Sequence, residues 1–215
     1  EFAQCGGSIN TDAVDNSGGV DMSDHEVNLK ILLRGPLQRG ELSATERNTL
    51  LASLAKHVTA DVLSHNHGQC AALSLETVRS RATLGSYQSF VKTLSASGQL
   101  DRRGEFLPND EAFAERAKQK LGLSRPELAI VLAHAKIAVT EAILRSNMLD
   151  EDFAESYLIS YFPEPLRKNY SSDIKRHRLR REITATQIAN ALVDFLGAVF
   201  VHRLTVETGA PERDV

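Results

Sequence analysis

The sequence predicts a mainly α-helical protein, built as a multi-helix bundle with short connections. Apolar residues recur at spacings of three and four through most of the chain, which is the period of a helix with one buried face. Helix start and stop signals separate these runs, and no strand pattern follows residue 20. With 215 residues, the chain can bury one substantial core.

The first two helices are predicted from capping boxes, in which Ser caps the helix and Glu bonds back to the cap. Ser23-Asp24-His25-Glu26 fits this pattern, and its helix should stop before Gly35-Pro36, since proline lacks the amide donor that helices need. A second capping box lies at Ser43-Ala44-Thr45-Glu46, and its helix should end where Asn66-His67-Gly68 breaks the pattern.

Three more helices are predicted through the middle of the chain. One spans roughly residues 74–96 and ends at Ser97-Gly98, and the next follows at about 111–121. The clearest start signal is Ser124-Arg125-Pro126-Glu127, with a cap, an early proline and a capping-box glutamate, and its apolar ladder continues to Asn147.

The last part of the chain predicts a short helix, a corner and a long helix. Asp150 is expected to cap the short helix, and Pro163 and Pro165 to form the corner. Apolar residues from Ile183 onward then indicate one long helix that ends at Gly209.

Composition describes an ordinary globular protein, with 42% hydrophobic residues, 25% charged residues and a net charge of -3. This balance shows no bias toward a nucleic-acid partner. Two cysteines, Cys5 and Cys70, cannot build a disulfide framework, which favours a reducing cytoplasm. No apolar run is long enough to cross a bilayer and no signal pattern opens the chain, so a cytoplasmic protein without membrane contact is expected.

Two clusters of functional residue types have simpler structural interpretations. His65-Asn66-His67 with Cys70 resembles a run of metal ligands, but no second cluster has ligand spacing, so we expect a helix end and no metal site. The basic run Lys175 to Arg181 has the charge to contact phosphate or an acidic partner. Acidic neighbours and helical spacing favour an ion-paired helix start there instead.

The stretch from Asn10 to Glu26 is the candidate ligand site. It is polar, contains a Gly-Gly pair and leads into a predicted helix start, where free amides and the helix dipole attract carboxylates and phosphates. The alternative is a glycine turn whose Asn and Asp side chains stabilise the bend. The residues alone leave both interpretations open.

Asn16 to Glu26, NSGGVDMSDHE, resembles the N-x-G-G-V-x-x-S-x-x-E segment of the amino-acid dehydrogenase superfamily. The wider stretch INTDAVDNSGGVDMSDHEVNLKILL is similar to the corresponding segment of the large bacterial NAD-specific glutamate dehydrogenases. Further similarities to that family are GLSRPELAIVLAHAKI at 122–137, YFP at 161–163, HRLRREITATQIAN at 177–190 and ETGA at 207–210. This sequence departs from the family where Gly18 replaces a frequent Ala and His134 a frequent Tyr.

The resemblance implies oxidative deamination of L-glutamate to 2-oxoglutarate and ammonia, with hydride transfer to NAD. Ser23 matches the serine that holds the substrate carboxylate, and Asn16, Gly18 and Gly19 match the segment beside the nicotinamide and substrate. The family's catalytic lysine and aspartate and its glycine-rich dinucleotide turn have no counterpart here. The resemblance therefore implies no catalytic residue in this chain and a main NAD site outside it.

The resemblance also implies two parts. Residues 1–34 would be the C-terminal edge of the catalytic domain, a short loop or strand remnant of its Rossmann-type fold with a connecting helix. Residues 35–215 would be a C-terminal helical domain with a structural or regulatory role in a homo-oligomer. Because the chain opens without Met, we expect it to be part of a longer protein. The alternative is a helical interaction or oligomerisation module without a catalytic role.

Overall fold

The computed structural model describes residues 2–210 and residue 214, and the described residues contain helices and no strand. The mainly α fold class is therefore confirmed. The helices are α1 (Asp12–Asp15), η1 (Asn16–Gly18), α2 (Val20–Gln38), α3 (Ala44–Ala82), α4 (Leu84–Ala96), α5 (Asp110–Lys118), α6 (Arg125–Arg145), η2 (Met148–Asp150), α7 (Asp152–Tyr161), α8 (Glu164–Asn169), α9 (Ser171–Lys175), α10 (Arg180–Leu196) and α11 (Phe200–Thr208).

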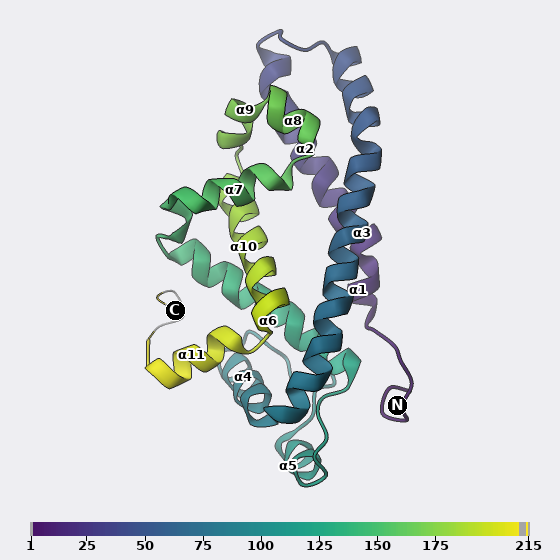
Figure 1. Ribbon diagram of the computed structural model, residues 1–215, viewed down its shortest axis with the longest axis vertical. Coiled ribbons are helices and arrows are strands. Elements are labelled where there is room, and N and C mark those ends of the chain that lie inside the picture. Colours follow the sequence, from purple (N-terminus) through teal and green to yellow (C-terminus); the bar gives the residue numbers. More distant parts are fainter. Residues whose placement is uncertain (1, 211–213, 215) are drawn as a thin grey trace.

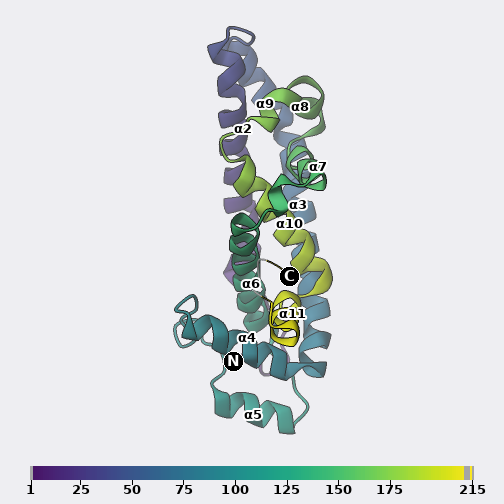
Figure 2. The same cartoon turned by 90° about the vertical axis from the view of Figure 1, so that its left-hand side faces the viewer.

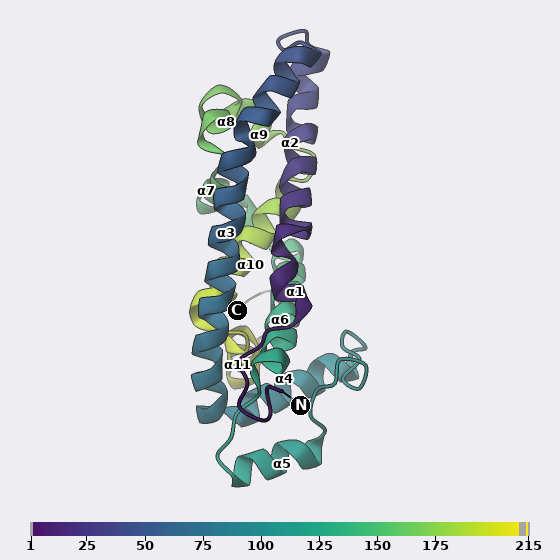
Figure 3. The same ribbon diagram turned by 90° about the vertical axis from the view of Figure 1, so that its right-hand side faces the viewer.

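The molecule is elongated, and α3 runs along most of its length (Figure 1). Helix α2 lies beside the first half of α3, which runs back antiparallel to it, as the turned view shows (Figure 3). The small helices α8 and α9 lie near the loop that joins α2 to α3, whereas α4 and α5 lie at the opposite end (Figure 2). Helix α10 packs against α6 and α7 in the middle of the bundle.

Two hydrophobic clusters hold the helices together. The first joins α4, α6, α10 and the second half of α3, with Tyr87, Phe113 and Leu128 almost fully buried. The second joins α2, the first half of α3 and the helices from α7 to α9, around Leu33 and Phe162. Because α3 contributes to both clusters, it connects the two ends of the bundle.

The start of the chain is more helical than predicted. A loop or strand remnant was expected, but α1 and η1 lead directly into α2, which begins at Val20 with Gly19 as its N-cap. Ser23 is therefore inside the helix, where its amide donates to the Gly19 carbonyl, so the predicted capping role of Ser23 is wrong. Neither Gly18 nor Gly19 has a positive φ.

Two predicted helix ends are also wrong. Helix α2 continues through Gly35-Pro36 to Gln38, and the predicted boundary between residues 34 and 35 falls inside it. Proline is tolerated because Pro36 lies in the last turn, where its ring is buried and only one helical hydrogen bond is lost. Helix α3 likewise continues through Asn66-His67-Gly68 to Ala82, since Gly68 alone weakens a helix too little to end it.

The cap signals placed other helices correctly. Ser43 accepts a hydrogen bond from the Glu46 amide and Glu46 accepts one from the Ser43 amide, so this capping box is confirmed. At the start of α6, Glu127 accepts a hydrogen bond of 2.7 Å from the Ser124 amide, which confirms the bond from the cap amide back to the capping-box glutamate. The long final helix is instead two helices, α10 and α11, separated by Gly197.

No single helix among the described residues is long and apolar enough to cross a membrane. Within the described part of the chain one helix pair, α10 and α11, reaches the necessary length and composition, and it is bent by 85° at the break. Helix α10 contributes Ile188, Ala189 and Val193 to the first hydrophobic cluster.

Candidate functional site

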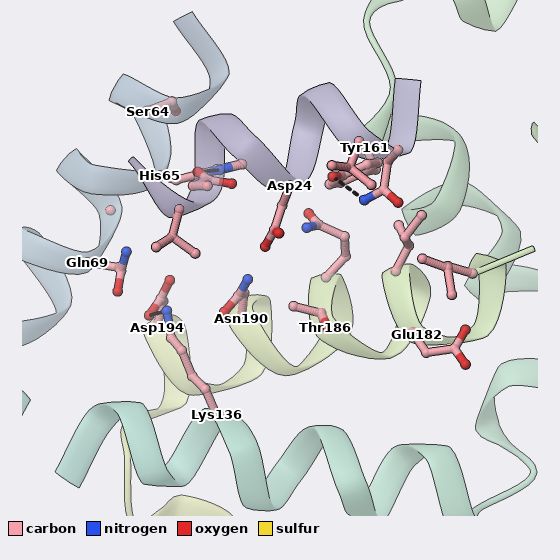
Figure 4. Close-up of a pocket in the computed structure, with 18 of the residues that line it drawn as sticks. Asp24, Ser64, His65, Gln69, Lys136, Tyr161, Glu182, Thr186, Asn190 and Asp194 are labelled. Atoms are coloured by element: carbon pink, nitrogen blue, oxygen red, sulfur yellow. Dashed lines mark hydrogen bonds and ion pairs between the residues drawn. The ribbon is translucent and has the colours of Figure 1, made fainter. Parts of the chain in front are cut away.

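A groove of about 740 Å³ lies between α2, α3, α6 and α10. Most of the residues that line it have polar side chains, and Figure 4 shows side chains from these helices around the groove. Besides the apolar Val20, Val27, Leu179 and Ile183, and Gly68, the lining residues are Asn16, Asp21, Asp24, Asn28, Ser64, His65, Gln69, Lys136, Tyr161, Glu182, Thr186, Gln187, Asn190 and Asp194.

One side of the groove carries an ion pair between α6 and α10. The Lys136 ammonium lies 2.8 Å from a carboxylate oxygen of Asp194, and the Lys136 side chain is 15% exposed. In Figure 4 Lys136 extends from α6 toward Asp194, while Asp24 points toward the same space from α2. The groove therefore combines one paired cation with several carboxylates and amides, groups that bind polar ligands through charge and hydrogen bonds.

Two histidines flank Asp21 where α2 meets α3. Nδ1 of His65 lies 2.8 Å from one carboxylate oxygen of Asp21, and Nε2 of His25 lies 3.6 Å from the other. The hydrogen bond to Asp21 raises the pKa of His65, whereas burial lowers the pKa of His25. Although both imidazoles lie beside Asp21, the protonated form is favoured at His65 and the neutral form at His25.

Tyr161 forms the wall behind His25. The two rings stack with centroids 4.4 Å apart and planes inclined by 8°. The Tyr161 hydroxyl accepts a hydrogen bond of 2.8 Å from the Asn28 side chain, drawn as a dashed line in Figure 4. Burial raises the pKa of Tyr161 to about 12, so the phenol remains protonated near neutral pH.

The structure brings only one of the four predicted ligand residues to this groove. Asn16 lines it, whereas Ser23, Gly18 and Gly19 are exposed at the start of α2 and do not line it. A Cβ on Gly19 would lie 2.7 Å from Oδ1 of Asn16, so the second glycine lets the Asn16 side chain fold back over the turn. Lys136 and Asp194 were not among the predicted site residues, because only the packing of α6 against α10 pairs them.

The side chains of the His65-Asn66-His67 and Cys70 run on α3 point to different partners. His65 turns toward Asp21 on α2, while His67 is exposed and Sγ of Cys70 lies 3.7 Å from the Asn10 amide that donates to it. The spacing of Asp21 and His25 at i and i+4 was visible in the sequence. Their approach to His65, 44 residues later in the chain, was not.

Ion pairs surround the basic run from Lys175 to Arg181. Lys175 lies 2.7 Å from a carboxylate oxygen of Glu155, Arg176 lies 3.8 Å from one of Asp173, and Arg181 lies 3.3 Å from one of Asp150. Ion pairing is therefore confirmed for these three side chains, but the run extends from the last residue of α9 into the start of α10 and is not a single helix start.

Comparisons with known proteins identify the family. Residues 1–76 match the family model described as bacterial NAD-glutamate dehydrogenase, catalytic domain, and residues 120–215 match the model described as glutamate dehydrogenase, C-terminal. The chain is 42% identical over 215 residues to the NAD-specific glutamate dehydrogenase of Halomonas elongata and 44% identical over 215 residues to that of Pseudomonas aeruginosa. It is 38% identical over 214 residues to the corresponding protein of Mycobacterium tuberculosis.

Both family models describe glutamate dehydrogenases, which defines the class of protein. More particularly, this chain belongs to the bacterial NAD-specific glutamate dehydrogenase family. All of the chain is covered in each comparison, and it spans 13% of the length of each of these relatives.

Proposed function

We propose that this chain contributes part of an NAD-dependent glutamate dehydrogenase, which converts L-glutamate, NAD and water to 2-oxoglutarate, ammonia and NADH. In this reaction a hydride leaves the α-carbon of glutamate for the nicotinamide, and water then replaces the nitrogen. The match of residues 1–76 to a catalytic-domain model supports the proposal, since it includes Asn16 to Glu26. Residues 35–215 would form a structural or regulatory helical domain, and residues 1–34 the edge of the Rossmann-type catalytic domain.

The observation that carries the proposal is the exposed start of α2. Asn16, Gly18, Gly19 and Ser23 lie within two helical turns and are all accessible to a ligand. The positive end of the helix dipole favours a carboxylate there, and a serine hydroxyl can donate a charge-assisted hydrogen bond to it. Ser23 would thus bind the substrate carboxylate, with Asn16, Gly18 and Gly19 beside the nicotinamide.

Asp21 lies in the first turn of α2, where a negative charge opposes the binding of an anion. Its carboxylate is hydrogen-bonded to His65, whose raised pKa favours the protonated imidazole. Protonation of His65 would offset the charge of Asp21 at the helix start.

Kinetics of the full-length enzyme test the role of Ser23. Ser23→Ala should raise the KM for glutamate roughly tenfold or more, the loss expected for a hydrogen bond to a charged group. The KM for NAD should change little. Ser53→Ala, which alters an exposed serine on α3, is the matched control. Unchanged glutamate kinetics in Ser23→Ala would contradict the assignment.

The catalytic groups are proposed to lie outside this chain, together with the main NAD site. The purified 215-residue chain should therefore fail to reduce NAD in the presence of glutamate. Turnover by this chain alone would contradict that part of the proposal.

A helical interaction or oligomerisation module is the second candidate function. Large apolar side chains are exposed on three helices, with Val78 on α3 at 69%, Phe195 on α10 at 79% and Val206 on α11 at 63%. A second chain that packed against these side chains would remove their apolar surface from water. Light scattering tests the idea, since a strict monomer that also fails to bind the rest of the enzyme would count against it.

A further inference from the structure

We propose that Asp21, His25 and His65 bind one zinc ion where α2 meets α3. The inference does not rest on the proposed function, because it follows from the placement of three side chains that no comparison assigns to a ligand.

The three side chains already converge. Each offers one ligand atom, and these atoms all lie within 4.8 Å of one another. In a tetrahedral zinc site with bonds of about 2.0–2.1 Å, neighbouring ligand atoms are roughly 3.3 Å apart. Nδ1 of His65 lies 2.8 Å from one carboxylate oxygen of Asp21 and Nε2 of His25 lies 3.6 Å from the other, so an ion between the imidazoles would meet an Asp21 oxygen beside each of them. Small side-chain rotations therefore suffice to hold an ion.

His25 provides an independent indication of a ligand. Its side chain is 1% exposed, and neither ring nitrogen has a hydrogen-bond partner among the residues that the structure describes. Buried polar groups in proteins are nearly always bonded, so a buried imidazole without a partner requires an explanation. A zinc ion would bind the lone pair of Nε2 and give this nitrogen the partner that it lacks.

Stacking fixes the direction of the buried ring. The His25 ring stacks with the Tyr161 ring, 4.4 Å away and inclined by 8°, and with the His65 ring, 5.9 Å away and inclined by 21°. These contacts restrict rotation of the His25 ring, so Nε2 keeps its direction toward Asp21. A ligand oriented before binding loses less conformational entropy when the ion arrives.

The ligand set and the local charge suit zinc. Two imidazoles and one carboxylate are a common zinc combination, and three protein ligands leave a fourth position for water or substrate. Asp61, one helical turn before His65 on α3, is close enough to act electrostatically on both imidazoles. Lys136 acts against a positive charge at His65, but its ammonium is paired with Asp194 at 2.8 Å. The side chains of Asp21 and His65 are 27% and 39% exposed, which gives the ion a route from solvent.

Equilibrium dialysis against Zn²⁺ tests the site. The 215-residue chain is first treated with EDTA, and bound zinc is then measured by atomic absorption. We expect one zinc per chain and a Tm that rises with zinc concentration, because the ion binds only the folded chain tightly. His65→Gln should weaken zinc binding roughly tenfold or more, since loss of even a group that supports a ligand costs that much.

Two control variants separate this site from the ligand run in the sequence. His67→Gln removes the second histidine of α3, and Cys70→Ser removes the thiol one turn from Asn66; both variants should bind zinc as tightly as the original chain. Co²⁺ in place of Zn²⁺ should give visible absorption without a thiolate charge-transfer band.

The zinc stoichiometry and the affinities of the folded variants decide whether Asp21, His25 and His65 form the site. Circular dichroism checks that the variants are folded. If His65→Gln does not fold, Asp21→Asn provides a second variant that lacks a zinc ligand. Less than one zinc per chain would overturn the proposal. Equal affinity in the original chain and in the folded ligand variant would also overturn it, as would loss of zinc in Cys70→Ser.

Discussion

The carboxylate of Glu76 accepts a hydrogen bond of 2.7 Å from the hydroxyl of Tyr87, and both side chains are fully buried. Glu76 also accepts hydrogen bonds from Arg79 at 3.0 Å and from the Ala198 amide at 3.3 Å. Burial raises the pKa of Tyr87, so its hydroxyl remains a donor at all ordinary pH values. This one carboxylate thus joins α3, α4 and the turn between α10 and α11.

Removing the Tyr87 hydroxyl should destabilise the fold. Tyr87→Phe leaves Glu76 with one donor fewer in a buried place, which should lower the free energy of unfolding by about 1–3 kcal/mol. Urea unfolding followed by circular dichroism measures the difference. Tyr157→Phe is the control, since that ring is only partly buried. Equal effects of the two substitutions would show that the bond to Glu76 contributes no stability.

Breaking the ion pair between α5 and α6 should also be costly. Arg116 donates two hydrogen bonds, of 2.7 and 2.8 Å, to the carboxylate of Glu127, which is only 10% exposed. Arg116→Met would leave that charge buried with the Ser124 amide as its remaining partner, at a cost of about 3 kcal/mol.

The loss should depend on pH in a defined direction. Burial acts to raise the pKa of Glu127, but the hydrogen bonds from Arg116 and Ser124 outweigh it and hold the pKa below its usual value. The stability from this pair is present near neutral pH and is lost as the pH falls through that lowered pKa. Unfolding free energies of Arg116→Met and the original chain should therefore converge in acid. Lys118→Met, at an exposed pair, should differ little from the original chain at either pH.

Two glycines should respond to alanine in opposite directions. Gly197 has a φ of 105°, and a Cβ there would lie 2.9 Å from both Arg79 and Glu76. Gly197→Ala should therefore destabilise the chain by about 1–3 kcal/mol. Gly68 lies inside α3 with open space around it, so Gly68→Ala should stabilise the chain by about 0.5–1 kcal/mol. Thermal unfolding compares them, and a destabilised Gly68→Ala would contradict the continuous α3.

His177 should make the fold sensitive to mild acid. Its Nδ1 accepts a hydrogen bond from the Leu179 amide, and its Nε2 donates one of 3.1 Å to the Asn28 carbonyl, so the buried ring is neutral. Burial lowers its pKa from the ordinary 6.5. The unfolded chain binds a proton first, and stability falls as the pH drops below about 6.5. His177→Gln should flatten this dependence.

His65 should act in the opposite sense, because its bond to Asp21 raises its pKa. The stability it contributes is present below the unfolded value of 6.5 and is lost as the pH rises through the raised pKa. With a chelator present, His65→Gln should make the fall in stability between about pH 7.5 and pH 5.5 steeper. Parallel pH profiles for His177→Gln and His65→Gln would contradict both assignments.

Helix existence was predictable, and helix ends often were not. Ser124 to Glu127 and Ser43 to Glu46 placed two starts correctly, because their hydrogen bonds are made within four residues. Ser23 to Glu26 has the same capping-box pattern, yet Ser23 lies inside a helix that begins at Val20, where Met22 packs against the second hydrophobic cluster. Tertiary burial decided this case over the local signal.

The candidate groove was the least predictable part. Asn16 was identified through a family resemblance, whereas Lys136 and Asp194 meet only because α6 packs on α10. Asp21 and His25 share a helix face by their spacing, but nothing local indicates that His65 faces them from α3. Sequence patterns indicate which residues of one helix lie on the same face. The groove instead brings together residues of different helices, which no local pattern indicates.

Helix α3 has 39 residues, which at about 1.5 Å each make a rod of roughly 58 Å. His65 lies past its midpoint and Glu76 lies near its end. The second hydrophobic cluster packs against its first half, and the first cluster packs against its second half. A rod of this kind does not bend easily, so a ligand that tilts α3 at the groove would displace its far ends by the largest amount. A ligand in the groove would then move Ser43, which caps the start of α3, and Tyr87, which is bonded to Glu76 near the end of α3, without touching either residue.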